Sequence, residues 1–187
     1  MNNNSEIGIH VLRAIERLTR GDNEDTNQLY RLLLRLKQNN ESLNETKTMW
    51  GLDALSFTAA TPPEYFCPFV IKILAMLISH GATNIQKAFE TALQCRNLDA
   101  ARFLYVQKDQ KDHKPVDVNA VNGSGESLLY QAVTRGGPSV KVVRFLVEKE
   151  ARVDTNPSPL EYLQGRLTWD PINRELFDIL KPHSQLF

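Results

Sequence analysis

Apolar residues recur along much of this chain at the three- and four-residue spacing of amphipathic helices. This spacing predicts helices over residues 6–20, 25–38, 70–79 and 97–104. The polar run 38–48 interrupts the pattern and is typical of a connecting loop. The pattern therefore predicts an all-helical chain, with its helices in consecutive antiparallel pairs.

The segment 117–154 carries the clearest internal pattern. It begins with Asp117-Val118-Asn119 and ends in a near-copy, Arg152-Val153-Asp154. A glycine-containing turn at 122–125, a short apolar helix, a Gly-Gly-Pro break and a second helix lie between them. A turn followed by two antiparallel helices in about thirty residues is one unit of a stacked helical solenoid.

The residues of this segment resemble the ankyrin repeat. Four residues match the glycine, threonine, leucine and alanine of that family's G-x-T-P-L-H-x-A signature: Gly125, Ser127, Leu129 and Ala132. Others match its second helix and closing turn: Val142, Val143, Leu146 and Ala151. Two positions depart from the family, because Tyr130 replaces the usual histidine and Glu150 replaces the usual glycine.

Weaker copies of the pattern occur elsewhere. Gly51, Leu55 and Ala59 match the glycine, leucine and alanine of the repeat, and Asp53 takes the threonine position. The leucine-type anchors of successive copies lie 34, 40 and 31 residues apart, at Leu55, Phe89, Leu129 and Leu160. These intervals approach the family period of about 33 once insertions are allowed for.

The resemblance implies an all-α, ankyrin-repeat helical solenoid of about five helix pairs, with short hairpin tips and degenerate terminal caps. Residues 1–47 are expected to form a helical cap or a degenerate repeat. Four repeats are expected to follow, at 48–83, 84–119, 120–154 and 155–187.

Ankyrin proteins generally bind protein partners through the hairpin tips and the exposed face of the first helices. In the repeat 48–83 these positions are Met49, Trp50, Leu52, Ala60 and Thr61. In the central repeat they are Val121, Gly123, Ser124, Glu126, Thr134 and Arg135. The resemblance therefore implies a protein partner and no cofactor, and we expect the chain to be monomeric on its own.

Trp50 is the most informative of these residues, because tryptophan is enriched at the energetic centres of interfaces. The alternative is that Trp50 folds over the stack or against the N-terminal helix pair. The proline-rich, aromatic insertion at 61–68 has the same two interpretations, and we favour packing against its own helix pair. The charged segment 107–114 is expected to be a solvated loop.

Composition sets further limits. Lys plus Arg equals Asp plus Glu, at 22 each, so no net field favours nucleic acid or an anionic membrane. Two cysteines are typical of a reducing compartment. The apolar run at 69–78 is too short to span a bilayer, and residues 1–6 lack the features of a secretory signal. We expect a cytoplasmic protein; translocation into a host cell cytosol stays open as an alternative.

No catalytic pattern is evident. The sequence contains neither a phosphate-binding glycine motif nor a Cys/His pair at zinc spacing, so no metal site is expected. We therefore predict a binding protein and not an enzyme. Three narrower hypotheses remain: a bacterial effector acting in a host cytosol, an inhibitor or adaptor that docks one enzyme, and an enzyme dependent on Cys67 or Cys95.

Overall fold

The computed structural model describes residues 5–21, 26–62, 69–107, 114–135, 138–167 and 170–184. These residues form ten α-helices and one short 3-10 helix, and the only extended pairing among them is two isolated β-bridges. The predicted all-helical class is confirmed. The chain divides into two compact units, the first unit Met1–Val116 and the second unit Asp117–Phe187.

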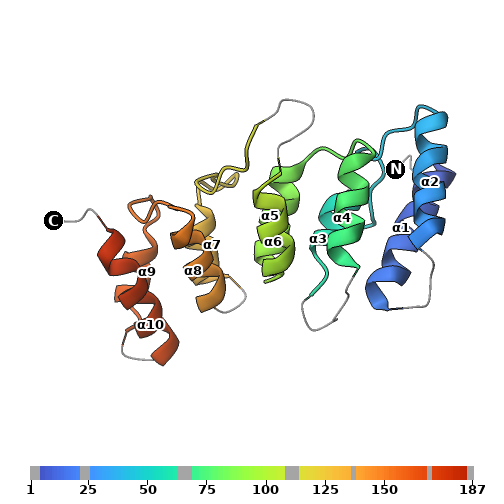
Figure 1. The fold of residues 1–187 in the computed structure, drawn as a ribbon. Coiled ribbons are helices and arrows are strands. Elements are labelled where there is room, and N and C mark those ends of the chain that lie inside the picture. The colour runs from blue at the N-terminus through green and yellow to red at the C-terminus, as the bar shows by residue number, and fades with distance from the viewer. Residues whose placement is uncertain are drawn as a thin grey trace. The chain divides into compact units, whose positions relative to one another are not determined.

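The first unit contains three consecutive helix pairs (Figure 1). The pairs are α1 (Glu6–Arg20) with α2 (Thr26–Gln38), α3 (Ala54–Ala59) with α4 (Val70–Ser79), and α5 (Ile85–Gln94) with α6 (Leu98–Tyr105). The first helices α1, α3 and α5 also pack in succession, as do the second helices α2, α4 and α6. In this unit the first helices of the pairs therefore form one row, and the second helices form an adjoining row.

The second unit repeats this arrangement with two pairs. These are α7 (Leu128–Thr134) with α8 (Val140–Glu148), and α9 (Pro159–Gln164) with α10 (Pro171–Leu180), followed by the 3-10 helix η1 (Lys181–His183). Again α7 packs against α9, and α8 packs against α10. The anchor residues predicted from the period are all buried: Leu55, Phe89, Leu129 and Leu160.

Four helices end in the same closing turn. After α4, Gly81 takes a left-handed backbone with φ of 91°, and the next amide, of Ala82, donates to the Leu77 carbonyl at 3.0 Å. After α8, Glu150 takes the same conformation with φ of 61°. Asn40 and Arg96 close α2 and α5 in this way. Glycine adopts this conformation without strain, so the non-glycine residues carry a conformational cost.

Asparagine side chains connect one helix pair to the next. Asn44 accepts a hydrogen bond from the Thr83 amide at 2.9 Å, and Asn119 accepts one from the Arg152 amide at 2.7 Å. Each asparagine is the third residue of a short loop whose middle residue is buried, Leu43 or Val118. The run 38–48 is a loop, as predicted. Within it, residues 42–44 take the same place in the fold as residues 117–119.

Candidate partner-binding surface

Two turns, at 48–53 and 122–127, have the same backbone structure. In the first, the Thr48 amide donates to the Leu52 carbonyl at 2.8 Å, and the Gly51 amide donates to the Thr48 carbonyl at 2.9 Å. The second turn reproduces both bonds 74 positions later, at 3.0 and 2.9 Å. Gly51 and Gly125 have φ of 74° and 77°. Each turn is therefore held in one conformation by its backbone.

Each turn leads directly into a capped helix. Asp53 accepts a hydrogen bond from the Ser56 amide at 2.8 Å at the start of α3, and Ser127 accepts one from the Tyr130 amide at 3.1 Å at the start of α7. Asp53 was predicted to occupy the threonine position of the repeat. Its carboxylate performs the capping that a hydroxyl performs at Ser127.

The tip of the first turn exposes two large apolar side chains. Met49 is 83% exposed and Trp50 is 72% exposed, whereas Leu52 is half-buried. Trp50 does not fold over its own helix stack. Thr61 differs from the prediction, because it is only 8% exposed and its carbonyl accepts a hydrogen bond from Asn97. Thr61 is therefore a packed residue at the end of α3, not a freely exposed contact.

A hollow lies beside Trp50. Its volume is about 350 Å³. It is lined by residues of α1, the turn and the end of α3: Glu16, Thr19, Arg20, Trp50, Phe57, Ala60, Thr61 and Pro62. Glu16 and Arg20 form an ion pair at 2.7 Å along α1. This hollow could not be predicted from the sequence, since it depends on the packing of α1 against α3.

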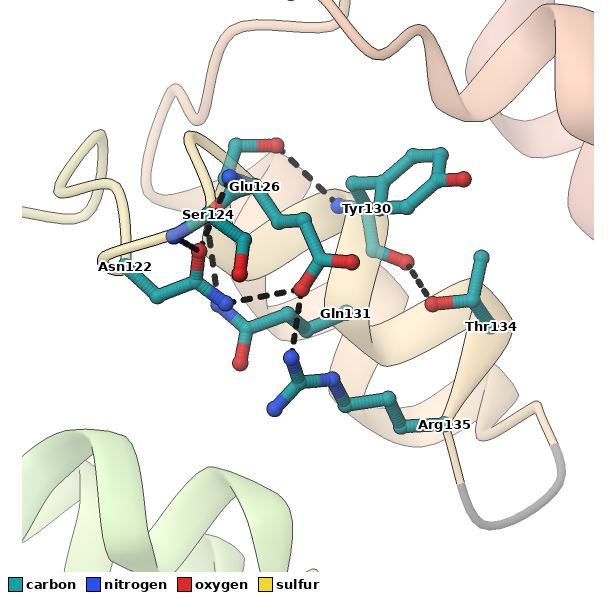
Figure 2. A network of polar contacts seen from close by, with 8 residues as sticks. Asn122, Ser124, Glu126, Tyr130, Gln131, Thr134 and Arg135 are labelled. Atoms are coloured by element: carbon teal, nitrogen blue, oxygen red, sulfur yellow. Dashed lines mark hydrogen bonds and ion pairs between the residues drawn. The ribbon is translucent and has the colours of Figure 1, made fainter.

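The second turn is organised by Asn122 (Figure 2). Its side-chain oxygen accepts hydrogen bonds from the amides of Ser124 and Glu126, at 2.8 and 3.0 Å. Its side-chain nitrogen donates to the Glu126 carboxylate at 2.7 Å. Ser124 is exposed, and Val121 is 61% exposed. This tip is thus more polar than the tip that carries Trp50.

Glu126 and Arg135, both predicted contacts, lie together in the structure. Figure 2 shows the Arg135 guanidinium directed at the carboxylate oxygen that also accepts from Asn122. The hydrogen bond from Asn122, and next the charge of Arg135, hold the pKa of Glu126 below its ordinary value. Thr134 donates its hydroxyl to the Tyr130 carbonyl at 2.9 Å. These side chains therefore form a local network and are not independent contacts.

An aromatic contact joins α7 to α9. Tyr130 and Tyr162 meet edge to face with ring centroids 5.9 Å apart. The guanidinium of Arg166 lies 3.9 Å from the Tyr162 ring centroid. In the sequence, Tyr130 stands out only because it replaces the usual histidine of the repeat. Its ring partner could not be inferred, because the two residues are far apart in sequence and Tyr162 belongs to a weaker copy of the pattern.

The cysteines and the metal-ligating side chains are the remaining candidates for a functional site. Burial raises the pKa of the Cys95 thiol, so less of the nucleophilic thiolate is present at neutral pH. Cys67 and most of the insertion at 61–68 lie outside the described residues, as does most of the segment 107–114. Within the described ranges, no three His, Cys, Asp or Glu residues are grouped to hold a metal ion.

No helix among the described residues is both long enough and apolar enough to cross a membrane.

No protein-family model matches the sequence, and no curated protein shows a significant match to it.

Proposed function

We propose that this chain is a diverged ankyrin-repeat protein that binds another protein and catalyses no reaction. Three features support the repeat assignment: the two turns with matching hydrogen bonds, the side-chain caps of α3 and α7, and the shared closing turns after α2, α4 and α8. The packing of first helices on first helices within each unit is what a stack of repeats requires.

The exposure of Met49 and Trp50 carries the binding proposal. Burying one such side chain is worth roughly 1.5–3 kcal/mol, and the free chain forgoes most of that at both residues. The turn that carries them is fixed by hydrogen bonds and by the positive φ of Gly51, so little backbone entropy would be lost on binding. A rigid turn that presents an exposed tryptophan beside a hollow has the characteristics of an interface anchor.

The test is partner capture with matched variants of the whole chain. Wild type, Trp50→Ala and Val106→Ala are used as bait, since Val106 is also exposed, at 71%, but lies at the end of α6. We expect one partner to be retained by wild type and Val106→Ala and lost with Trp50→Ala, while all three give the same circular dichroism. Retention by a folded Trp50→Ala protein would refute binding through this tip.

A further inference from the structure

The second turn contains the only asparagine in the chain that is followed by glycine, Asn122-Gly123. In such a pair the backbone nitrogen of the glycine can attack the side-chain carbonyl carbon of the asparagine, because no Cβ shields that nitrogen. Gly123 is exposed, and a Cβ built on it would meet no atom within 4 Å. Within the described ranges the Gly123 amide makes no hydrogen bond. The attacking nitrogen is therefore unengaged and lies in an exposed residue.

The hydrogen bonds of Asn122 hold its side chain over the peptide that follows it (Figure 2). Its side-chain oxygen accepts from the Ser124 amide at 2.8 Å. The ring closed by this bond contains both the Cγ atom of Asn122 and the nitrogen of Gly123, as in any turn of this kind. The side-chain carbon is thus directed toward the nitrogen that would attack it.

The same side-chain oxygen receives two backbone donors. The amides of Ser124 and Glu126 lie 2.8 and 3.0 Å from it. Negative charge develops on this oxygen when a nitrogen adds to Cγ, and donors that are already in place stabilise that charge. Both donors belong to a turn whose backbone is itself hydrogen-bonded, so the addition requires little rearrangement of the turn.

Other positions of the chain lack this arrangement. In the first turn, Thr48 and Met49 take the places of these two residues, so that turn has neither the side-chain amide nor the unshielded nitrogen. Asn119 is followed by alanine, and its side-chain oxygen accepts from the Arg152 amide, 33 residues away. The side chain of Asn119 is therefore held by a distant segment and not by the peptide that follows it.

We propose that Asn122 is a deamidation site in the folded chain. The Gly123 nitrogen bonds to Cγ of Asn122, the bond from Cγ to the side-chain nitrogen breaks, and ammonia leaves with the proton of the Gly123 amide. Water then opens the resulting succinimide at either carbonyl carbon and leaves an aspartate or an isoaspartate at position 122. No electrons are transferred, and water is the only co-reactant. This modification does not depend on the proposed function.

Either product changes the second turn. The side-chain nitrogen of Asn122 donates to the Glu126 carboxylate at 2.7 Å, and an aspartate would place a second carboxylate there. Two carboxylates so close repel each other, so Glu126 and its contact with Arg135 have to rearrange. An isoaspartate also lengthens the backbone and breaks the register of the bond from the Asn122 amide to the Glu126 carbonyl. Deamidation therefore remodels one of the two predicted contact surfaces.

Incubation of the full-length protein in heavy-oxygen water, at physiological temperature and mildly alkaline pH, tests the inference. Peptide mapping by tandem mass spectrometry should show that Asn122 loses its amide and gains heavy oxygen while Asn119 stays intact. Gly123→Ala adds a Cβ where there is open space and no positive φ, so the fold should persist while conversion slows about tenfold or more. Ser124→Ala keeps the backbone donor and should leave the rate unchanged.

Four results would count against the inference. An amide that persists at Asn122, or is lost no faster than that of Asn119, would overturn it. Conversion only after the chain is unfolded in urea would also overturn it, because the turn would then protect the amide. A rate unaffected by Gly123→Ala would exclude the Gly123 nitrogen as the nucleophile. Asn122→Asp should lower the urea concentration at which the chain unfolds, and an unchanged midpoint would refute the remodelling of the turn.

Discussion

Replacing Asn97 by alanine is expected to destabilise the first unit strongly. Asn97 is 7% exposed and lies between α5 and α6. Its side-chain oxygen accepts a hydrogen bond from the Ala100 amide at 3.1 Å, which caps α6. Its side-chain nitrogen donates to the Thr61 carbonyl at 2.8 Å, across 36 residues. One side chain thus starts a helix and joins two consecutive helix pairs.

The magnitude follows from these two bonds. Losing an N-cap costs about 1 kcal/mol. Losing the donor leaves the Thr61 carbonyl without this hydrogen bond in a buried position, which costs about 1–2 kcal/mol more. The free energy of unfolding should therefore fall by about 2–3 kcal/mol in Asn97→Ala. Asn97→Ser keeps an oxygen able to cap α6 and loses only the donor, so about half of that loss is expected.

Urea unfolding of the full-length chain, followed by circular dichroism, measures both variants against wild type. The two substitutions must leave the dependence of free energy on urea concentration unchanged for the comparison to hold. A loss below about 1 kcal/mol in Asn97→Ala would refute the reasoning. Equal losses in the two variants would show that the cap at Ala100 contributes nothing.

Three further predictions concern stability, and urea unfolding measures each. Gly8→Ala should lower the free energy of unfolding by about 1–2 kcal/mol, because the added Cβ would overlap the buried Thr46 side chain. This loss is expected although alanine has the better helix propensity, and an unchanged free energy of unfolding would contradict it. Glu150→Gly should stabilise the chain by about 1 kcal/mol and Gly81→Ala should destabilise it similarly, since both positions have positive φ; opposite signs would contradict the closing-turn assignment. The pKa of Glu126 is lowered in the folded chain, so the stabilisation by its charged form is complete above the unfolded-state pKa and is lost as the pH falls through the lower folded-state pKa. The stability gap between wild type and Glu126→Gln should therefore narrow as the pH falls through the acid range, and a gap that does not depend on pH would contradict this.

The helical periodicity and the turn signals predicted much of the fold. Leu55 and Leu129 were predicted as core anchors because they match the leucine of the ankyrin signature, and both are buried. Asp53 was assigned to the threonine position of the same signature, and in the structure its carboxylate caps α3. Local backbone chemistry determines these features, so a short stretch of sequence is enough to predict them.

One assignment is wrong for a local reason. Thr58 and Ala132 each lie seven residues after their turn glycines, so Thr58, and not Ala59, takes the position of Ala132.

Features that depend on packing between distant segments could not be predicted. Burial of Thr61 depends on its bond to Asn97, 36 residues away. The hollow beside Trp50 likewise depends on α1, for which the spacing of apolar residues predicts a helix but no neighbour.

The pairing of Glu126 with Arg135 shows a third limit. Both residues were predicted as contacts from their places on the repeat, which specify exposure but not local partners. In the structure Asn122 positions the Glu126 carboxylate, and that carboxylate then binds Arg135. Such a network depends on side-chain rotamers, which hydrophobic periodicity does not determine.

The central claim is that Trp50 becomes buried when the partner binds. The chain has two tryptophans, so a Trp169→Phe variant labelled with fluorotryptophan gives a single fluorine resonance, from position 50. Fluorine NMR of this protein, alone and with a saturating amount of the captured partner, reports the solvent exposure of that side chain directly. We expect a resonance that shifts and loses its sensitivity to a soluble paramagnetic quencher in the complex. An unchanged resonance that stays equally sensitive to the quencher at saturation would contradict it.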